Sequence, residues 1–160
     1  MEGTVTIRRL ESGDVESVLA IQLGCPGLAQ WTRQDYEAVA RGEMPGWIAL
    51  REEDSDSTAG ATRTAMVGFL VARLLAPEIE ILNLGVDPAA RRRGTARALL
   101  AEALRWGAAN GAQKAFLEVR ASNRAAIQFY ESRGFQLAGL RAKYYSAPVE
   151  DALRLAAQID

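Results

Sequence analysis

The sequence predicts an α+β (mixed α/β) domain, and three observations lead to that prediction. The length of 160 residues suits one domain, because two cores of half that size would each bury too little surface. With 49% hydrophobic and 24% charged residues, the composition is typical of a globular protein rather than a disordered chain or a membrane span. Apolar residues recur along the chain, at helical spacing in some segments and at strand spacing in others.

The first elements follow from capping residues and apolar spacing. Residues 5–10 predict a strand, and the polar residues 12–14 can cap the helix that follows. The apolar side of that helix is expected to consist of Val15, Val18, Leu19 and Leu23. After a loop that contains glycine and proline, Thr32 or Asp35 can begin a second helix that runs to about residue 40.

Three strands are expected next. Residues 47–50 predict the first of them, and the small, polar and acidic residues 52–64 predict a mobile hairpin loop rather than a domain linker. Residues 66–75 and 78–86 predict the other two strands, which a short turn with Pro77 separates.

The remaining residues predict a βαβ crossover followed by two strands. Apolar residues recur at helical spacing from Ala96, and Asn110-Gly111 ends this helix. The elements expected after it are a strand at 115–121, a short helix at 123–133, and two strands at 135–145 and 152–156. The chain therefore predicts the order β-α-α-β-β-β-α-β-α-β-β, without an internal repeat.

The amino-acid inventory excludes several kinds of catalysis. The chain has no histidine, which is the most frequent general base and metal ligand, and Cys25 is its one cysteine. Serine–histidine and cysteine–histidine catalysis, intrachain disulfides and cysteine-rich zinc sites are therefore ruled out, and no metal is expected. Catalysis would use carboxylates, tyrosine, lysine, arginine or backbone dipoles, and Cys25 is expected to be a buried or incidental thiol.

Charge is divided unevenly along the chain, although the net charge is only −1. Residues 1–80 carry 13 acidic and 7 basic side chains, a balance of −6, whereas residues 81–160 carry 7 acidic and 12 basic ones, a balance of +5. A basic half suits a phosphate-ligand site or a nucleic-acid surface, and it also arises by chance. The N-terminus shows no pattern of a secretory signal, so a cytoplasmic location is expected.

The passage 81–96 predicts a strand, a short turn and the start of a helix. A helix N-terminus offers free backbone N–H groups and a partial positive charge, so it can hold a phosphate. Gly94 and Ala96 allow a ligand to approach this backbone, and three consecutive arginines add positive charge. The alternative is a solvated, basic helix start. Neither glycine motif for ATP or NAD occurs, so the turn is expected to bind a different anionic ligand.

This turn resembles the signature of a known family. The run Arg91-Arg92-Arg93-Gly94-Thr95-Ala96 is similar to the [QR]-x-x-G-x-[GA] motif of the GNAT superfamily of acetyl-CoA-dependent N-acetyltransferases. The resemblance to the bacterial ribosomal-protein-alanine N-acetyltransferases extends over the segments 117–123, 126–135, 141–145 and 150–152. It is strong over 81–156 and weak over 1–75, where such enzymes differ and substrates are selected.

The resemblance implies a single GNAT-type domain over 1–160. Its central sheet would be mixed, mostly antiparallel and twisted, with about seven strands flanked by about four helices, and with splayed fourth and fifth strands. Acetyl-CoA would be the co-substrate, its pyrophosphate on the turn and its pantetheine beside the fourth strand. The residues that would bind it are Leu84, Gly85, Val86, Arg91, Arg92, Arg93, Gly94, Thr95, Ala96, Asn123 and Tyr130.

Three of these binding residues carry more specific expectations. Gly85 stands where an alanine is more usual and is expected at a bulge, and the departure should be tolerated because the interaction uses the backbone. The N–H of Val86 would polarise the thioester carbonyl. Asn123 is expected to cap the helix that follows it as well as to contact CoA.

The resemblance also implies two catalytic residues, Glu118 as the general base and Tyr130 as the proton donor to the CoA thiolate. From the residues alone, Glu118 can equally be an exposed or ion-paired strand glutamate, and Tyr130 a core residue. A glutamate at its reference pKa of ~4.3 is a weak base, so partial burial or an ordered water would have to help it. Phe129 and Phe135 are expected to serve the packing and to leave the Tyr130 hydroxyl free.

Four aromatic residues fall in segments that wall the peptide groove in this family, with core packing as the alternative for each. They are Trp31, Tyr36, Tyr144 and Tyr145. The acidic N-terminal half, including Glu43, could attract a basic N-terminal peptide. An N-terminal amine with a pKa near ~8 is easier to deprotonate than a lysine near ~10.4, which favours an α-amine substrate. Ribosomal protein S18 is the type substrate that the resemblance implies.

Two further classes of function stay open. One is a GNAT enzyme that acts on a small amine, a lysine or an antibiotic, and the other is a CoA-sensing or nucleic-acid-binding module. In the main interpretation the partner is a protein N-terminus, such as that of a ribosomal protein, with no nucleic acid and no membrane. A monomer or a weak homodimer is expected.

Overall fold

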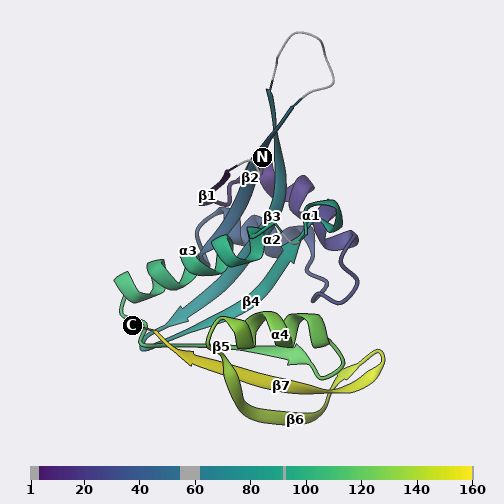
Figure 1. Cartoon of the computed structure of the whole chain (residues 1–160), viewed down its shortest axis with the longest axis vertical. Helices are drawn as coiled ribbons and strands as arrows, with labels where there is room; N and C mark the ends of the chain where they lie inside the picture. The colour runs from purple at the N-terminus through teal and green to yellow at the C-terminus, as the bar shows by residue number, and fades with distance from the viewer. Residues whose placement is uncertain (1–3, 55–61, 92, 160) are drawn as a thin grey trace. The chain divides into compact units, whose positions relative to one another are not determined.

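A computed structural model of the chain describes residues 4–54, 62–91 and 93–159 (Figure 1). Its strands are β1 (Val5–Arg9), β2 (Gly46–Asp54), β3 (Thr62–Leu75), β4 (Glu78–Val86), β5 (Lys114–Arg120), β6 (Gln136–Ser146) and β7 (Val149–Gln158). Its helices are η1 (Ser12–Asp14), α1 (Val15–Leu23), α2 (Arg33–Ala40), η2 (Pro88–Ala90), α3 (Thr95–Ala109) and α4 (Arg124–Ser132), of which η1 and η2 are short 3-10 helices. Apart from these two turns, the order of elements is the predicted one.

The strands form a seven-stranded sheet with the order β1-β2-β3-β4-β5-β7-β6. β1 pairs antiparallel with β2, β2 with β3, and β7 with both β5 and β6. β4 and β5 are parallel, and α3 connects them, which confirms the predicted α+β class with a mixed sheet and a βαβ crossover. The parallel pairs join residues 78–81 to residues 114–117, and the splaying of these two strands stays a prediction.

The hairpin of β2 and β3 is longer than the sequence predicted. We expected a loop over 52–64, but Glu52 pairs with Thr64, and Glu53 pairs with Arg63. Antiparallel pairing satisfies the backbone groups whatever the side chains are, so polar residues extend both strands. The loop prediction is therefore wrong at both of its ends, and its central part, residues 55–61, lies outside the described residues.

Contacts along the chain divide it into two compact units. The first comprises residues 1–72 and 83–103, and the second comprises residues 73–82 and 104–160. The predicted anion-binding turn belongs to the first unit, whereas the two predicted catalytic residues belong to the second. One domain over 1–160 stays a prediction.

In the first unit, α1 buries a different side from the one the sequence predicted. Val15 and Val18 are buried as expected, but Leu23 is 82% exposed, and Ile21 and Gln22 are buried in its place. Successive residues of an α-helix are about 100° apart, so Leu23 lies on the far side of a face centred between Val18 and Gln22. The inclusion of Leu23 in the apolar side is therefore wrong.

The start of α2 uses both residues that the sequence offered for it. Thr32 is the N-cap, and its hydroxyl accepts a hydrogen bond from the Asp35 amide at 3.1 Å. The Asp35 carboxylate in turn accepts from the Thr32 amide at 2.7 Å, which completes a capping box. The hydrogen bonds that the Thr32 amide and hydroxyl donate to the Asp35 carboxylate lower the pKa of Asp35.

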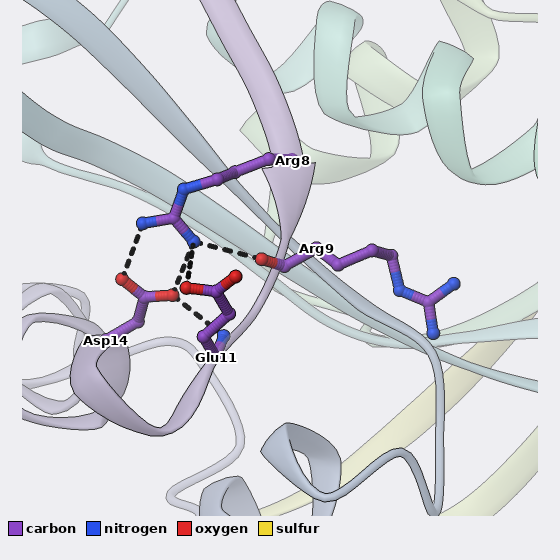
Figure 2. Close-up of polar contacts among 4 residues, drawn as sticks. All are labelled: Arg8, Arg9, Glu11 and Asp14. Atoms are coloured by element: carbon purple, nitrogen blue, oxygen red, sulfur yellow. Dashed lines mark hydrogen bonds and ion pairs between the residues drawn. The ribbon is translucent and has the colours of Figure 1, made fainter.

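A buried carboxylate joins β1 to the turn before α1 (Figure 2). Arg8 donates to Asp14 with both terminal nitrogens, at 2.8 Å and 2.9 Å, and the Glu11 amide also donates to Asp14 at 2.8 Å. Burial would raise the pKa of Asp14, but these hydrogen bonds and the Arg8 charge outweigh it, so the pKa is lowered. Figure 2 shows the Arg9 guanidinium pointing away from this cluster.

In the second unit, β5 alternates between a buried and a half-buried side, as its sequence predicts. Leu117 and Val119 are buried, whereas Phe116, Glu118 and Arg120 share the other side. The strand pairs with β7 along its whole length, from Lys114 to Arg120. This pairing fixes the backbone on which the predicted general base stands.

Candidate active site

In the first unit, the turn between β4 and α3 is fixed by hydrogen bonds at its start. β3 carries an extra residue, Val67, between the pairs that join it to β2, and the Val67 carbonyl accepts from the Asp87 amide at 2.9 Å. The Asp87 side chain then accepts from the Ala89 amide at 3.0 Å and caps η2. These contacts direct the chain out of the sheet directly after Val86.

The turn ends at Gly94, immediately before α3. Gly94 has φ = 79°, a left-handed conformation that glycine adopts without strain. In the described part of the chain, and apart from the two neighbours of Gly94 in the sequence, no heavy atom lies within 4 Å of where a Cβ would stand, so these residues leave the backbone open to a ligand. The first turn of α3 leaves N–H groups without helical partners, and Arg91 and Arg93 carry exposed positive side chains beside it. The residues present therefore fit an anionic group such as a phosphate, while Arg92 lies outside the described residues.

Sequence reasoning missed Arg51, the buried cation beside this turn. Arg51 Nη2 donates to the Thr95 hydroxyl at 3.2 Å and to the Arg93 carbonyl at 3.4 Å. Arg51 and Thr95 are both buried, and a Cβ at Gly68 would make a tight contact of 3.0 Å with the Thr95 methyl group. An arginine directly after the apolar residues 47–50 was the available signal, but spacing alone does not tell on which side of a strand a cation is buried.

The end of β4 is held by the thiol of Cys25. The Cys25 thiol donates to the Val86 carbonyl at 3.3 Å, and Arg91 Nη2 donates to the Cys25 sulfur at 3.4 Å. Cys25 is buried, which was one of the two possibilities that the sequence left open for it. It connects the loop after α1 to the candidate site. The oxyanion role of the Val86 N–H stays a prediction.

Gly85 is a close-packing position in the first unit. A Cβ at Gly85 would lie 2.7 Å from Phe69 Cε1 and 2.8 Å from Leu28 Cδ1. The structure therefore gives a steric reason for glycine at this position. Whether the strand bulges at Gly85, as the sequence predicted, stays a prediction, as does the contact of Leu84 with pantetheine.

In the second unit, Glu118 forms an ion pair, which was one of the alternatives that the sequence left open. Arg141 Nε lies 3.0 Å from Glu118 Oε1, and the Glu118 side chain is 13% exposed. The carboxylate is thus mostly buried and fixed by a guanidinium that is itself 56% exposed. The role of Glu118 as a base stays a prediction.

Tyr130 is buried on α4 between two phenylalanines. Its ring centroid lies 5.1 Å from that of Phe129 and 5.4 Å from that of Phe135, so Tyr130 shares the packing rather than being released from it. Burial raises the pKa of Tyr130 far above its usual range. A higher pKa makes the phenol a weaker acid, and the role of Tyr130 as the proton donor stays a prediction.

Asn123 caps α4, as predicted. Its side chain accepts from the Ala126 amide at 3.2 Å. The contact of Asn123 with CoA stays a prediction, because the capping role alone accounts for an asparagine here.

Tyr36 does not line a groove, and its assignment to substrate binding is wrong. Its side chain is fully buried, and its hydroxyl donates to Gln22 and accepts from Asn83 Nδ2, the latter at 3.0 Å. Burial raises the pKa of Tyr36. The ring packs edge-on against Phe69 at 5.6 Å, so Tyr36 is a core residue, which was the alternative that the sequence left open.

Trp31 lies next to this core and is half-buried. It stacks on Tyr36 with centroids 5.6 Å apart, and its backbone exchanges two hydrogen bonds with the Gln22 side chain, at 2.9 Å and 3.1 Å. The loop between α1 and α2 is therefore anchored to a buried polar group, and contact of Trp31 with a substrate stays a prediction.

Tyr144 and Tyr145 lie near the end of β6, where its pairing with β7 shifts. Between the pairs Arg141–Ala152 and Tyr145–Glu150, β6 has three residues and β7 has one, and Lys143 has φ = 53°. The guanidinium of Arg120 lies 4.1 Å from the Tyr145 ring centroid, whereas Tyr144 is exposed. The irregular strand thus presents an aromatic pair of which one ring is accessible.

Glu43, which the sequence suggested as an attractor of basic peptides, is paired within its own segment. Arg41 Nη2 donates to Glu43 Oε2 at 2.7 Å, and both side chains are exposed. Because Arg41 offsets its charge, Glu43 adds little to a negative surface. Among the described residues there is neither a helix long and apolar enough to cross a membrane nor a cluster of acidic and cysteine side chains placed to hold a metal.

The chain resembles known acetyltransferases in sequence and in fold. The model of a family described as the acetyltransferase (GNAT) family matches residues 16–135. The ribosomal protein bS18-alanine N-acetyltransferase of Escherichia coli strain K12 is 40% identical over 96 residues, which are 59% of this chain and 65% of that protein.

Two solved structures show the same fold along nearly the whole chain. The ribosomal-protein-S18-alanine N-acetyltransferase from Escherichia coli has a TM-score of 0.75 at 28% identity, covering 98% of this chain and 95% of that one. Arabidopsis thaliana NAA60 in complex with acetyl-CoA has a TM-score of 0.82 at 20% identity, covering 98% and 99%. The second likeness concerns the fold alone.

Proposed function

The chain belongs to the acetyltransferase (GNAT) family, and from this premise we propose that it transfers an acetyl group from acetyl-CoA directly to a primary amine. The observation that carries the proposal is the positively charged turn before α3, where Gly94 leaves the backbone open to an anionic ligand. The pyrophosphate of acetyl-CoA is such a ligand, and the backbone amides of the residues around Gly94 would bind it.

The chemistry assigns three tasks to residues of this chain. Glu118 takes a proton from the ammonium group of the acceptor, and the freed amine nitrogen bonds to the thioester carbonyl carbon. The Val86 N–H stabilises the negative charge that develops on the carbonyl oxygen. The carbon–sulfur bond then breaks, and Tyr130 donates a proton to the departing thiolate. The nitrogen loses its second proton, which restores the Tyr130 phenol by way of solvent, and Glu118 releases the first proton to water. The products are an N-acetyl amide and CoA.

The acceptor is proposed to be the N-terminal α-amine of a protein, with ribosomal protein S18 as the first candidate. The Escherichia coli relative at 40% identity is named for that acceptor, although the match covers 65% of its length. Chemistry supports the same choice, because an α-amine loses its proton more readily than a lysine side chain does. The exposed ring of Tyr144 is available to contact the peptide that follows the amine.

A panel of acceptors tests the proposal. The purified chain is incubated with acetyl-CoA and a peptide that carries the N-terminus of ribosomal protein S18, and mass spectrometry locates the acetyl group. A peptide with a blocked N-terminus and one free lysine, together with lysine, polyamines and aminoglycosides, serves as the comparison. Acetylation of the α-amine alone supports the proposed acceptor, whereas preferential acetylation of a lysine or a small amine contradicts it.

Thermal melting with and without acetyl-CoA, together with the product assay, distinguishes an enzyme from a module that only binds CoA. A ligand present at 100 times its dissociation constant stabilises the folded protein by ~2.7 kcal/mol. A flat melting curve with saturating acetyl-CoA would contradict every function that uses CoA. A clear shift without product from any amine would favour a CoA-sensing module.

A further inference from the structure

Arg51 is a buried cation with unsatisfied donors. Its Nη2 atom donates to the Arg93 carbonyl and to the Thr95 hydroxyl. Nε and Nη1 are buried and have no hydrogen-bond partner in the described part of the chain, which leaves three N–H bonds without an acceptor. Buried polar groups of folded proteins are almost always hydrogen-bonded, so an unpaired guanidinium indicates a missing partner.

The surroundings of Arg51 add to its positive charge rather than offsetting it. None of the acidic side chains in the described ranges forms an ion pair with Arg51, whose polar contacts are a neutral carbonyl and a neutral hydroxyl. Thr95 is the first residue of α3, and the N-terminus of a helix carries a partial positive charge. Arg93 adds another cation on the turn. A negative charge at this place would therefore be stabilised by three positive groups: the Arg51 guanidinium, the N-terminus of α3 and the Arg93 side chain.

The position of the guanidinium fixes where that negative charge would act. Arg51 holds the turn on both sides of Gly94, through the carbonyl before it and the hydroxyl after it. Gly94 itself is exposed and has open space beside it. An anion at Gly94 would lie over the backbone that Arg51 fixes from the buried side.

We infer that Arg51 is the buried counter-charge for a pyrophosphate group bound at the turn before α3. The inference rests on the proposed function for the identity of the ligand as CoA, and it goes beyond it by assigning a residue of β2 to the binding of that ligand. Arg51 acts by fixing the turn and by placing a full positive charge behind it, where water screens the charge little. Without the anion, the unpaired buried charge of Arg51 destabilises the folded protein. When the anion is bound, the attraction between the two charges stabilises it.

This inference distinguishes Arg51 from a residue that only supports the fold. A buried charge that lacks a partner does not stabilise a protein, and an apolar residue of similar volume often replaces it without loss. Arg51→Met is therefore expected to melt at the same temperature as the wild type or higher when no ligand is present. A purely structural arginine would instead lower the melting temperature on replacement.

The test measures binding of dephospho-CoA, which carries the pyrophosphate but lacks the 3′-phosphate, by calorimetry and by thermal shift. Arg51→Met is expected to bind dephospho-CoA and CoA about tenfold more weakly than the wild type, by the same factor for both, while binding of pantetheine is unchanged. Arg63→Met is the matched control, because it removes the same charge from an exposed position on β3. It should bind all three ligands as the wild type does.

Unchanged binding of dephospho-CoA by Arg51→Met would overturn the inference. So would a loss confined to CoA, which would assign the charge to the 3′-phosphate, or an equal loss for pantetheine, which would indicate general damage. If Arg51→Met does not fold, Arg51→Lys and Arg51→Gln decide: affinity for dephospho-CoA must fall in the order Arg, Lys, Gln, and equal affinities of Lys and Gln would contradict a role of the charge.

Failure of this inference is distinguishable from failure of the proposed function. A wild-type chain that binds dephospho-CoA through Arg51 but acetylates no amine would leave the inference standing and remove the proposed activity. Conversely, the wild-type chain can acetylate its acceptor while Arg51→Met binds dephospho-CoA as tightly as the wild type does. That result would support the proposed function and remove the role of Arg51.

Discussion

Arg141 on β6 forms an ion pair with Glu118 on β5, with 3.0 Å between Nε and Oε1. The two strands are not neighbours in the sheet, because β7 lies between them, so the arginine side chain reaches across a strand to the carboxylate. Long side chains lose conformational freedom in such a contact, and a partly exposed ion pair returns little stability. The contact therefore fixes the position of the Glu118 carboxylate and adds little to the stability of the fold.

Glu118→Gln is expected to lower kcat by about 10²-fold or more, because the amide cannot accept the proton of the acceptor amine. Binding of acetyl-CoA should be unchanged, and stability should change by less than about 1 kcal/mol, since the ion pair is partly exposed. Glu78→Gln is the matched control, because Glu78 also pairs with an arginine, Arg154, at 3.7 Å. Steady-state kinetics with the N-terminal peptide provides the measurement, and equal rates for the wild type and Glu118→Gln would remove the base assignment.

The Asp14 carboxylate should make stability depend on acidic pH. Its pKa is lowered in the folded protein, so the folded state favours the ionised form more than the unfolded state does. The resulting stability is present above the unfolded pKa of about 3.9 and is lost as the pH falls through the lower, folded value. Urea denaturation of the wild type between pH 7 and pH 3 should show this loss.

Asp14→Asn isolates that contribution. It should be less stable than the wild type at pH 7 by about 1.5–3 kcal/mol, because hydrogen bonds between charged groups are replaced, and the difference should shrink toward pH 3. Glu43→Gln, at an exposed ion pair, should show almost no difference at either pH. A difference between Asp14→Asn and the wild type that stays constant with pH would show that the charge of Asp14 is not its cause.

Local chemistry made parts of this fold predictable from the sequence. The capping box of Thr32 and Asp35 and the cap at Asn123 involve residues three apart, so their contacts follow from helix geometry alone. The alternation along β5 likewise placed Glu118 on the half-buried side, because side chains of a strand alternate whatever surrounds it. The strand–turn–helix at Gly94 could be read from glycine and the arginines beside it.

Other positions depend on contacts between distant segments, which spacing does not reveal. For Tyr36 the sequence left a groove residue and a core residue as alternatives, and the structure places it in the core, where Gln22 and Asn83 from two other segments bind its hydroxyl. Arg51 was overlooked for a related reason, since its partners lie 42 and 44 residues further along the chain. In both cases the chemistry of the residue was visible, but the element packed against it was not.

Gly85→Ala should destabilise the protein by about 1–3 kcal/mol, because the added methyl group overlaps Phe69 and Leu28. Phe69 is fully buried against Tyr36 and has little room to move. Gly13→Ala is the control, since among the described residues nothing beyond its own neighbours in the chain lies within 4 Å of its Cβ position. Chemical denaturation compares the two, and equal stability of Gly85→Ala and the wild type would show that Phe69 adjusts and that glycine is not required at this position.

The two buried tyrosines provide the sharpest separation of catalysis from stability, because the same substitution should have opposite effects at the two positions. Tyr130→Phe keeps the ring between Phe129 and Phe135, so stability should be close to that of the wild type, while kcat should fall by about 10²-fold if the hydroxyl is the proton donor. Tyr36→Phe removes the buried hydroxyl that joins Gln22 to Asn83, while Gln22 keeps its hydrogen bonds to the Trp31 backbone and Asn83 keeps one to the Ala29 carbonyl. It should therefore lose about 0.5–1.5 kcal/mol of stability.

The kinetics of the folded Tyr36→Phe variant should match the wild type, since Tyr36 is a core residue that contacts no reacting group. Each tyrosine is thus the control for the other: both variants remove one buried hydroxyl, and only the place of the hydroxyl differs. The measurements are the melting temperature, from thermal denaturation, and kcat, from steady-state kinetics, for each of the two variants. A Tyr130→Phe variant that is destabilised but turns over normally would identify Tyr130 as a packing residue and would require another proton donor for the thiolate.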